Sequence, residues 1–330
     1  MSTFEYLDAV VHAITQASAS GGCRTFELRP ADSGAFPSFD AGAHIDVHLR
    51  PSLIRQYSLL GSPHDRSRYL ICVRRDPRGR GGSIAMHQEV AVGQQLRISA
   101  PRNRFPLAAA ARYVLIAGGI GITPLLAMAD TLTRQHAEFA LHHYASTQAE
   151  APLLEELKAS DYSDRVTLHY DDVDGGIRAE LPAELSAPDP QAAVYLCGPG
   201  GFMNHVINEA VAVGWRYDQL HTERFAPAPP SPAQLGIDGS ARAQFAVRVA
   251  RTGLTYQVPA DQSIAEVLVA NGVDIKLSCQ QGLCGTCLTP VLAGEPDHRD
   301  EVLTPAERAS NDRIAICCSR SRSPELLLGL

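Results

Sequence analysis

Four cysteines late in the sequence have a spacing suited to an iron–sulfur cluster. Three of them lie within nine residues, in Cys279-Gln-Gln-Gly-Leu-Cys284-Gly-Thr-Cys287, and Cys317 follows after 29 intervening residues. This C-x4-C-x2-C…C pattern is typical of a plant-type [2Fe–2S] cluster, in which four thiolates hold two irons. Gly282 and Gly285 give the loop the backbone freedom to curl around the irons.

A zinc site or disulfides are the alternative interpretations of these cysteines, although zinc sites usually show paired C-x2-C units. Cys318 stands directly beside Cys317. We assign the fourth ligand to Cys317 because it keeps the plant-type gap, and we expect Cys318 to face away as a buried apolar residue. The other three cysteines, Cys23, Cys72 and Cys197, are interpreted as small buried residues in a reducing compartment.

Two glycine-rich segments have the composition of nucleotide-binding turns. Gly118-Gly-Ile-Gly-Ile-Thr-Pro124 follows the apolar run Tyr113–Ala117 and precedes an amphipathic segment that extends to about Gln135. Glycines between a strand and a helix let a diphosphate approach the backbone, although the pattern departs from G-x-G-x-x-G and a tight structural turn is the alternative. Cys197-Gly-Pro-Gly-Gly-Phe-Met203 follows a later predicted strand, at the edge where open α/β sheets bind ligands.

The segment that follows the second predicted strand of this region carries information about the nucleotide. It reads His143-Tyr-Ala-Ser-Thr-Gln-Ala-Glu150 and contains no Lys or Arg that could bind the 2′-phosphate of NADPH. The sequence therefore favours NADH. Asp171 and Asp172, after the next strand, are either acceptors for ribose hydroxyls or part of a solvated turn.

Two further segments, earlier in the chain, combine polar groups that could bind a cofactor. Arg55-Gln-Tyr57-Ser58-Leu59 offers a cation, an aromatic ring and a hydroxyl, and strand alternation places Arg55 and Tyr57 on one side and Ser58 on the other. Gly79-Arg-Gly-Gly-Ser83 opens a predicted helix, where backbone amides, a hydroxyl and Arg80 would bind an anion. Each segment is also compatible with an ordinary strand or loop, so their joint occurrence before a nucleotide-binding region is the argument for a site.

Three regions of different periodicity would position these residues. Residues 1–107 give short alternating strands suited to an antiparallel β-barrel. Residues 108–226 repeat strand–helix units, which predict a doubly wound α/β domain with a parallel sheet. Four prolines crowd the segment 227–240, where we expect an extended linker. Residues 241–330 predict a small β-grasp, ferredoxin-like domain.

The β-grasp prediction rests on the elements before the cysteine loop. Residues 246–250 and 254–258 alternate like a hairpin, and Ser263 and Glu266 have the spacing of a capping box at the start of a helix that ends near Ala270. Acidic side chains gather further on, at Glu295-Pro-Asp-His-Arg-Asp-Glu301. We interpret this charged segment as either a docking edge for a partner or a solvated turn.

Length and charge exclude several classes of protein. At 330 residues the chain exceeds the size at which one core stops growing, so several domains are expected. The net charge of −7 and a pI near 5.9 leave no basic stripe for nucleic acid. No apolar run approaches ~20 residues, and Met1-Ser-Thr-Phe-Glu-Tyr6 lacks the basic start of a signal peptide, so we expect a cytoplasmic protein that does not bind membranes.

In chain order these motifs resemble the phthalate dioxygenase reductase family of flavoproteins, which includes reductase subunits of vanillate demethylase-like systems. The resemblance covers essentially all 330 residues and implies FMN on the barrel, NADH on the α/β domain and a [2Fe–2S] cluster in the ferredoxin domain. The compact loop at 79–83 is compatible with FMN rather than FAD. The motifs that carry the resemblance are Arg55-Gln-Tyr-Ser, Gly81-Gly-Ser83, Gly118-Gly-Ile-Gly-Ile-Thr-Pro, Cys197-Gly-Pro, His221-Thr-Glu-Arg-Phe225 and the four cysteines.

The resemblance also implies roles for single residues. Ser58, Thr123 and Phe225 would lie at the reacting centre, with Thr123 where nicotinamide meets the flavin and Phe225 stacked on the flavin ring; a core aromatic is the alternative for Phe225. The residues implied to contact the flavin are Arg55, Tyr57, Ser58, Leu59, Gly81, Gly82, Ser83 and Phe225. Those implied to contact the nucleotide are Gly118, Gly119, Gly121, Thr123, Asp171, Cys197, Gly198 and Pro199.

These cofactors together imply a direction of electron flow. NADH releases two electrons at once and an iron–sulfur cluster accepts one, and a flavin can connect the two. We therefore expect the order NADH, FMN, [2Fe–2S] and an external acceptor, with the chain acting as a monomer. The expected acceptor is a terminal Rieske non-haem iron oxygenase, and the alternatives are a di-iron or haem hydroxylase or, in another class, a redox sensor.

Overall fold

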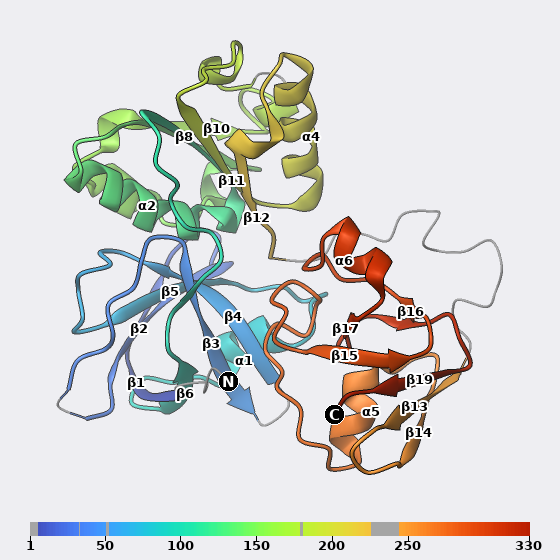
Figure 1. Ribbon diagram of the computed structural model, residues 1–330. Coiled ribbons are helices and arrows are strands. Elements are labelled where there is room, and N and C mark those ends of the chain that lie inside the picture. The colour runs from blue at the N-terminus through green and yellow to red at the C-terminus, as the bar shows by residue number, and fades with distance from the viewer. Residues whose placement is uncertain (1–5, 33, 51–52, 179–180, 226–243) are drawn as a thin grey trace. The chain divides into compact units, whose positions relative to one another are not determined.

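The computed structural model describes residues 6–32, 34–50, 53–178, 181–225 and 244–330 (Figure 1). The chain divides into two compact units, Met1–Phe225 and Ala226–Leu330. The first unit contains two sheets and the second unit contains the cysteine loop. The linker expected at 227–240 lies outside the described residues.

The first sheet of unit 1 is an antiparallel barrel. Its strands follow the order β4-β5-β2-β1-β6-β3-β7, and an additional pairing of β4 with β3 closes it, so the paired strands satisfy one another's backbone groups. Inward side chains such as Phe26, Ile45 and Ile71 are completely buried. The strands are β1 Tyr6–Gln16, β2 Cys23–Pro30, β3 Ala43–Arg50, β4 Leu53–Leu60, β5 Tyr69–Arg74, β6 Gln95–Ser99 and β7 Arg102–Asn103, and helix α1 spans Gly82–Gln88.

The second sheet of unit 1 is parallel and doubly wound, as predicted. Its order is β10-β9-β8-β11-β12, so the chain reverses its direction of winding between β8 and β11. An open α/β sheet binds its ligand at the carboxyl ends of the strands beside such a switch point. The elements are β8 Arg112–Gly118, α2 Ile122–Arg134, β9 Glu138–Ala145, α3 Leu154–Ala159, β10 Val166–Tyr170, β11 Ala192–Cys197, α4 Gly200–Ala212 and β12 Leu220–Glu223.

Helices cover both faces of this parallel sheet because alternate side chains of β8 point to opposite sides. Leu115 belongs to the core under α2, which also includes the interior of the barrel, whereas Val114 and Ile116 belong to the core under α4. Helix α2 also packs on the barrel strand β4. Short 3₁₀ turns occupy several connections: Gly119–Gly121, Gln148–Glu150, Ser163–Arg165, Gly176–Arg178, Ala183–Leu185 and Tyr217–Gln219.

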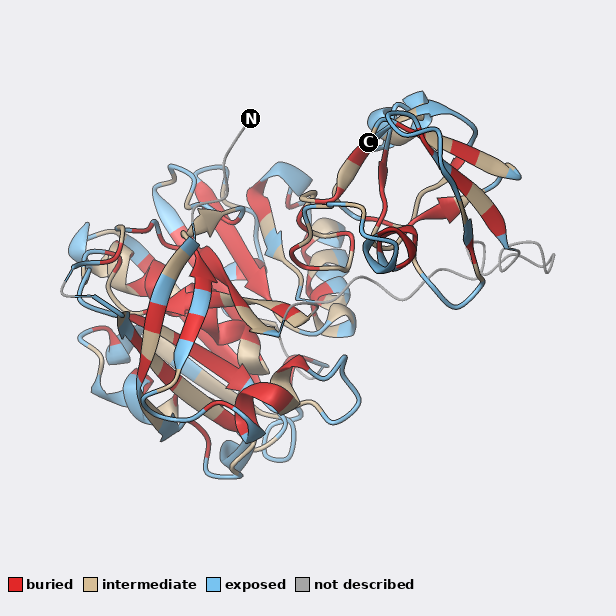
Figure 2. Cartoon of the chain, turned by 90° about the horizontal axis from the view of Figure 1, so that it is seen from below, coloured by how far each residue is buried: buried red, intermediate tan, exposed pale blue. Residues whose placement is uncertain are grey.

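Unit 2 is a β-grasp, in which helix α5 crosses a mixed sheet of order β14-β13-β19-β15-β17. Ser263 and Glu266 form the predicted capping box at the start of α5, and the predicted hairpin is β13 with β14. Buried residues from the strands and from α5 form its core. Figure 2 colours the buried residues red. The elements are β13 Phe245–Val249, β14 Thr255–Val258, α5 Ile264–Ala270, β15 Leu288–Ala293, β16 Pro296–Asp297, α6 Pro305–Ser310, β17 Arg313–Ala315, β18 Arg320–Ser321 and β19 Glu325–Leu328.

The helices of both units are short. The longest of those that the structure describes, α2 and α4, have 13 residues each. Among the described residues, no helix has both the length and the apolar character that crossing a bilayer requires.

Candidate functional site

The predicted flavin-binding segment lies on β4, in the wall of the barrel. Arg55 donates a hydrogen bond from Nη2 to the carbonyl oxygen of Arg80 at 2.5 Å, so its guanidinium group reaches the loop at 79–83. Tyr57 is half-buried, and this burial raises the pKa of its hydroxyl. Ser58 and Leu59 are buried. The structure thus brings the Arg55 segment and the predicted anion-binding loop together.

That loop turns into helix α1 at Gly82. Gly81 has a left-handed backbone with a φ of 79°, a conformation that favours glycine. Ser83 Oγ accepts a hydrogen bond from the backbone N–H of Asp76 at 3.0 Å, so its hydroxyl also stabilises the fold of the loop. The binding of a flavin phosphate by Gly81, Gly82 and Ser83 stays a prediction.

The two glycine-rich segments meet at the switch point between β8 and β11. A Cβ atom on Gly121 would overlap the carbonyl group of Cys197, so only glycine allows the two segments to approach this closely. Thr123, in the first turn of α2, is buried and donates from Oγ1 to the carbonyl oxygen of Ile120 at 3.0 Å. Gly118, Gly198 and Pro199 lie at the same edge, where the sequence predicted a nucleotide site.

A carboxylate that the sequence analysis did not single out links this edge to the barrel. Glu223, the last residue of β12, lies beside Cys197 in the strand register, and Ser58 Oγ donates to its Oε2 at 3.5 Å. Burial raises the pKa of Glu223 to about 8 and that of the Cys197 thiol well above its ordinary value. Its position at the carboxyl end of a strand next to the switch point is the signal that could have identified it.

Phe225 follows β12 and is the last described residue of unit 1. It is 39% exposed, so the alternative of a core aromatic is wrong. Its predicted stacking on the flavin ring stays a prediction.

Asp171 lies at the carboxyl end of β10, two strands away from the switch point. Its backbone N–H donates to the carbonyl oxygen of Ala145 at 3.1 Å, and its side chain is exposed beside Gly176. On the neighbouring strand Tyr144 stacks against His169 with ring centroids 4.1 Å apart. The contact of Asp171 with a ribose hydroxyl stays a prediction.

Four of the five cysteines of unit 2 form two pairs. The thiols of Cys279 and Cys284 share a hydrogen bond, and so do those of Cys287 and Cys317. Among the described residues, no three His, Cys, Asp or Glu side chains converge as a single-ion site would require. Each iron of a [2Fe–2S] cluster takes two of the four thiolates, so two pairs are the arrangement that this cluster needs.

Backbone amides point toward the sulfurs of this loop. The N–H of Cys279 donates to Sγ of Cys284 at 3.5 Å, and the N–H of Gln281 donates to Sγ of Cys279 at 3.4 Å. The hydrogen bond with Cys279 lowers the pKa of the Cys284 thiol to about 5. Amides that point at sulfur stabilise negative charge there, and this is one of the factors that set the potential of an iron–sulfur cluster. The residues present therefore fit the predicted cluster.

The expectation that Cys318 faces away from this loop is wrong. Cys318 is half-buried, and its Sγ would lie only 2.5 Å from a Cβ atom added to Gly282, in the middle of the loop. The reason is local: β17 ends at Ala315, and the N–H groups of Cys318 and Ser319 both donate to the carbonyl oxygen of Ala315. Strand alternation therefore does not apply to neighbours in this turn.

The charged segment 295–301 is largely neutralised within its own unit. Asp297 pairs with Arg299 at 2.7 Å, and Glu295 pairs with Arg322 at 3.4 Å. Asp300 is buried and accepts hydrogen bonds from the N–H of Leu303 and from Ser319 Oγ. These contacts favour the interpretation of this segment as a structural turn over that of a docking edge.

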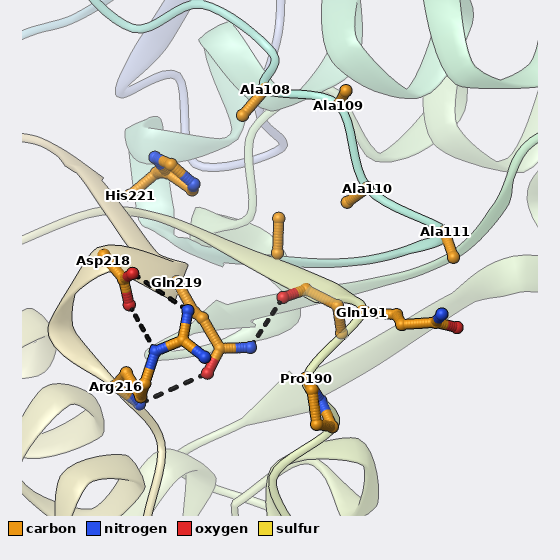
Figure 3. Close-up of a pocket in the computed structure, with 12 residues that line it drawn as sticks. Ala108, Ala109, Ala110, Ala111, Pro190, Gln191, Arg216, Asp218, Gln219 and His221 are labelled. Atoms are coloured by element: carbon orange, nitrogen blue, oxygen red, sulfur yellow. Dashed lines mark hydrogen bonds and ion pairs between the residues drawn. The ribbon is translucent and has the colours of Figure 1, made fainter.

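A cavity of about 390 Å³ opens at the opposite edge of the parallel sheet, where β8, β11 and β12 begin (Figure 3). Residues 108–111 form one wall, and the ion pair of Arg216 with Asp218, at 2.9 Å, lies on the other side with His221. Nucleotides bind at the carboxyl ends of such strands, so this cavity is not the predicted NADH site.

Two family descriptions match parts of the chain. "Oxidoreductase NAD-binding domain" matches residues 115–208, and "2Fe-2S iron-sulfur cluster binding domain" matches residues 247–322. The second match includes all four paired cysteines.

Proteins similar over almost the whole chain are also known. A vanillate O-demethylase oxidoreductase of Pseudomonas sp. (strain HR199 / DSM 7063) is 47% identical over 93% of this chain and 95% of that protein. The solved structure of phthalate dioxygenase reductase, described as a modular structure for electron transfer from pyridine nucleotides to [2Fe-2S], is 33% identical with a TM-score of 0.77 and covers 98% of both chains. An intact type IV self-sufficient cytochrome P-450 monooxygenase is 36% identical with a TM-score of 0.77, over 98% of this chain and 41% of that one.

Proposed function

Because the chain belongs to the family of phthalate dioxygenase reductase and the vanillate O-demethylase oxidoreductases, we propose that it passes single electrons to a terminal Rieske non-haem iron oxygenase. The protein is an NADH-dependent oxidoreductase whose cofactors are NADH, FMN and a [2Fe–2S] cluster. The bound flavin supplies the exchange between the two-electron chemistry of NADH and the one-electron chemistry of the cluster.

The reduction potentials of the two kinds of cluster support this direction of transfer. The reduction potential of a plant-type cluster is about −400 mV, whereas that of a Rieske cluster is roughly −150 mV or higher. A difference of roughly 250 mV for one electron corresponds to an equilibrium constant on the order of 10⁴ in favour of the oxygenase. Such a partner would accept one electron at a time, as the plant-type cluster delivers them.

Family membership carries the choice of acceptor, and the contact of Ser58 on β4 with Glu223 at the end of β12 supports the first step, from NADH to FMN. This contact joins the strand expected to line the flavin to the edge of the parallel sheet expected to bind nicotinamide. Helix α2, which begins beside Thr123, packs on the same barrel strand. Both sites therefore belong to one compact unit with a shared core, which supports direct transfer between NADH and FMN.

We propose a task for each group of residues that the sequence singled out. Arg55, Tyr57, Ser58 and Leu59 orient the flavin, and Gly81, Gly82 and Ser83 hold its phosphate. Thr123 and Phe225 position the nicotinamide and the flavin ring, and Asp171 accepts a ribose hydroxyl. Cys197, Gly198 and Pro199 close the nucleotide edge together with Gly118, Gly119 and Gly121.

The domain limits that we propose are those expected from the sequence. Residues 1–107 bind FMN, residues 108–226 bind NADH and residues 241–330 hold the cluster. We propose in addition that the protein acts as a monomer in the cytoplasm. Its charge, with a net value of −7, supports a protein partner rather than a nucleic acid.

The test is reconstitution with purified Rieske oxygenases. We expect NADH consumption to be coupled to product formation with at least one of them. The matched control is a Cys284→Ala variant, which should keep flavin and ferricyanide reduction but lose oxygenase turnover. Oxygenase turnover by this variant at the wild-type rate would mean that electrons leave from the flavin, which contradicts the proposal.

A haem monooxygenase is the second candidate acceptor, because almost all of this chain aligns with part of a self-sufficient cytochrome P-450 monooxygenase. Reduction of a separate haem hydroxylase, with no Rieske oxygenase accepting electrons, would favour this alternative. Steady reduction of cytochrome c by NADH separates both enzymatic functions from a redox sensor, which needs no sustained turnover.

A further inference from the structure

The turn after β17 brings the thiols of two adjacent residues, Cys317 and Cys318, close to one residue of the cluster loop, Gly282. The backbone N–H of Gly282 donates to Sγ of Cys317. Sγ of Cys318 lies 2.5 Å from the position that a Cβ atom on Gly282 would take, and Gly282 has a φ of 75°. Glycine at this position therefore makes room for the second thiol.

The same two thiols also interact with each other. The thiol of Cys317 hydrogen-bonds to that of Cys287 and to that of Cys318, so it lies between them. The other hydrogen-bond contacts of Cys318 are long, at 3.7 Å to the carbonyl oxygen of Ala315 and 3.8 Å to Ser319 Oγ. Apart from the hydrogen bond to the Cys317 thiol, a change of the Cys318 side-chain rotamer would break only these two long contacts.

Packing against the unit 2 core is only one of the contacts of Cys318. A buried structural cysteine is normally enclosed by apolar side chains, as Cys23 and Cys72 are in the barrel. Cys318 is instead half-buried at the edge of the unit 2 core and lies against the loop that carries three cluster ligands. Its position is that of a thiol beside a metal site.

We propose that Cys318 is a reserve ligand of the cluster, which binds the iron in place of Cys317 when the Cys317 thiolate is lost. The inference rests on the [2Fe–2S] cluster assigned above. The exchange breaks one iron–sulfur bond to Cys317 and forms one to Cys318. Cys318 releases its proton to solvent while a free Cys317 takes one up. One thiolate replaces another and no electron is transferred, so the oxidation states of the irons do not change.

The test compares alanine variants of the full-length protein, because serine could itself bind iron through its hydroxyl. The variants are Cys317→Ala, Cys318→Ala, the double variant, and Cys284→Ala as a ligand without an adjacent cysteine. Iron and acid-labile sulfide are measured per bound flavin, which corrects for the amount of folded unit 1. The electron paramagnetic resonance spectrum of the reduced protein reports the ligand set.

We expect Cys317→Ala to retain most of its iron with shifted g values, and Cys318→Ala to keep the wild-type spectrum. The double variant and Cys284→Ala should each contain at least about tenfold less iron per bound flavin than the wild type. Loss of iron from Cys317→Ala as complete as from the double variant would overturn the reserve-ligand proposal. Loss from Cys318→Ala but not from Cys317→Ala would also overturn it, because Cys318 would then be the resident ligand. Wild-type protein without iron would instead refute the cluster itself.

Discussion

The buried carboxyl of Glu223 should make the stability of unit 1 depend on pH. Folding raises the pKa of this group from an ordinary value of 4.5 to about 8, because burial disfavours the charged form, while the hydrogen bond from Ser58 partly opposes the shift. The folded chain therefore binds this proton more tightly than the unfolded chain does. The stabilisation is complete below about pH 4.5, declines as the pH rises and is lost above about pH 8.

The size of the effect follows from the shift. Over the whole window it amounts to about 5 kcal/mol, and between pH 6 and pH 9 the loss is about 2.7 kcal/mol. Position 223 of a Glu223→Gln variant cannot ionise. The free energy of unfolding of the wild type, relative to that of the variant, should therefore fall by about 2.7 kcal/mol between pH 6 and pH 9. For a unit of this size the difference corresponds to roughly 5–10 °C in the midpoint of thermal unfolding.

The assay is thermal unfolding of the full-length, NADH-free holoprotein, followed by the fluorescence of released flavin so that unit 1 is observed. Glu209→Gln, an exposed glutamate on α4, is the matched control and should show a difference from wild type that does not change with pH. If the wild-type and Glu223→Gln midpoints stay in parallel from pH 6 to pH 9, the carboxyl is not buried as described and the reasoning is refuted.

Three further predictions concern the cofactors and the electron path. Acid extraction of the red-brown protein should release FMN, and recovery of FAD alone would overturn the flavin assignment. NADH should be preferred to NADPH by at least about tenfold in kcat/KM with ferricyanide, or about 1.4 kcal/mol, because no cation follows Tyr144 on β9; equal values would show that a basic residue reaches the site from elsewhere. Cleavage within 227–240 should leave a 1–226 fragment that reduces ferricyanide but has lost most cytochrome c reduction, and a fragment that supported oxygenase turnover at the full rate would contradict transfer through the cluster.

Local sequence patterns predicted the elements that depend on near neighbours. The run at Tyr113–Ala117 became β8, and the capping box at Ser263 formed, because backbone propensity and side chains three residues apart determine these features. The spacing of Cys279 and Cys284 likewise places these two thiols within hydrogen-bonding distance of each other.

Contacts between distant segments were not predictable in the same way. Ser58 and Glu223 are 165 residues apart in sequence, and the packing of α2 on the barrel strand β4 belongs to the tertiary contacts that bring the two domains together. Cys318 was misjudged because its orientation was expected only from the choice of its neighbour Cys317 as the ligand, whereas the chain turns after Ala315. Whether a strand ends at that residue depends on hydrogen bonds with the rest of the unit, which a short sequence window does not contain.

The position of β19 has a consequence for how the protein is made. This strand pairs with β13 and β15 and lies in the middle of the unit 2 sheet, yet it follows every cluster cysteine in the sequence. A ribosome therefore synthesises the thiol loop before the strand that completes its framework, and pairings of high sequence separation form late. During that interval the thiols are exposed to oxidants and to competing metals. A nascent chain stalled before Glu325 would present its cysteines without the central strand of the sheet that holds them in place.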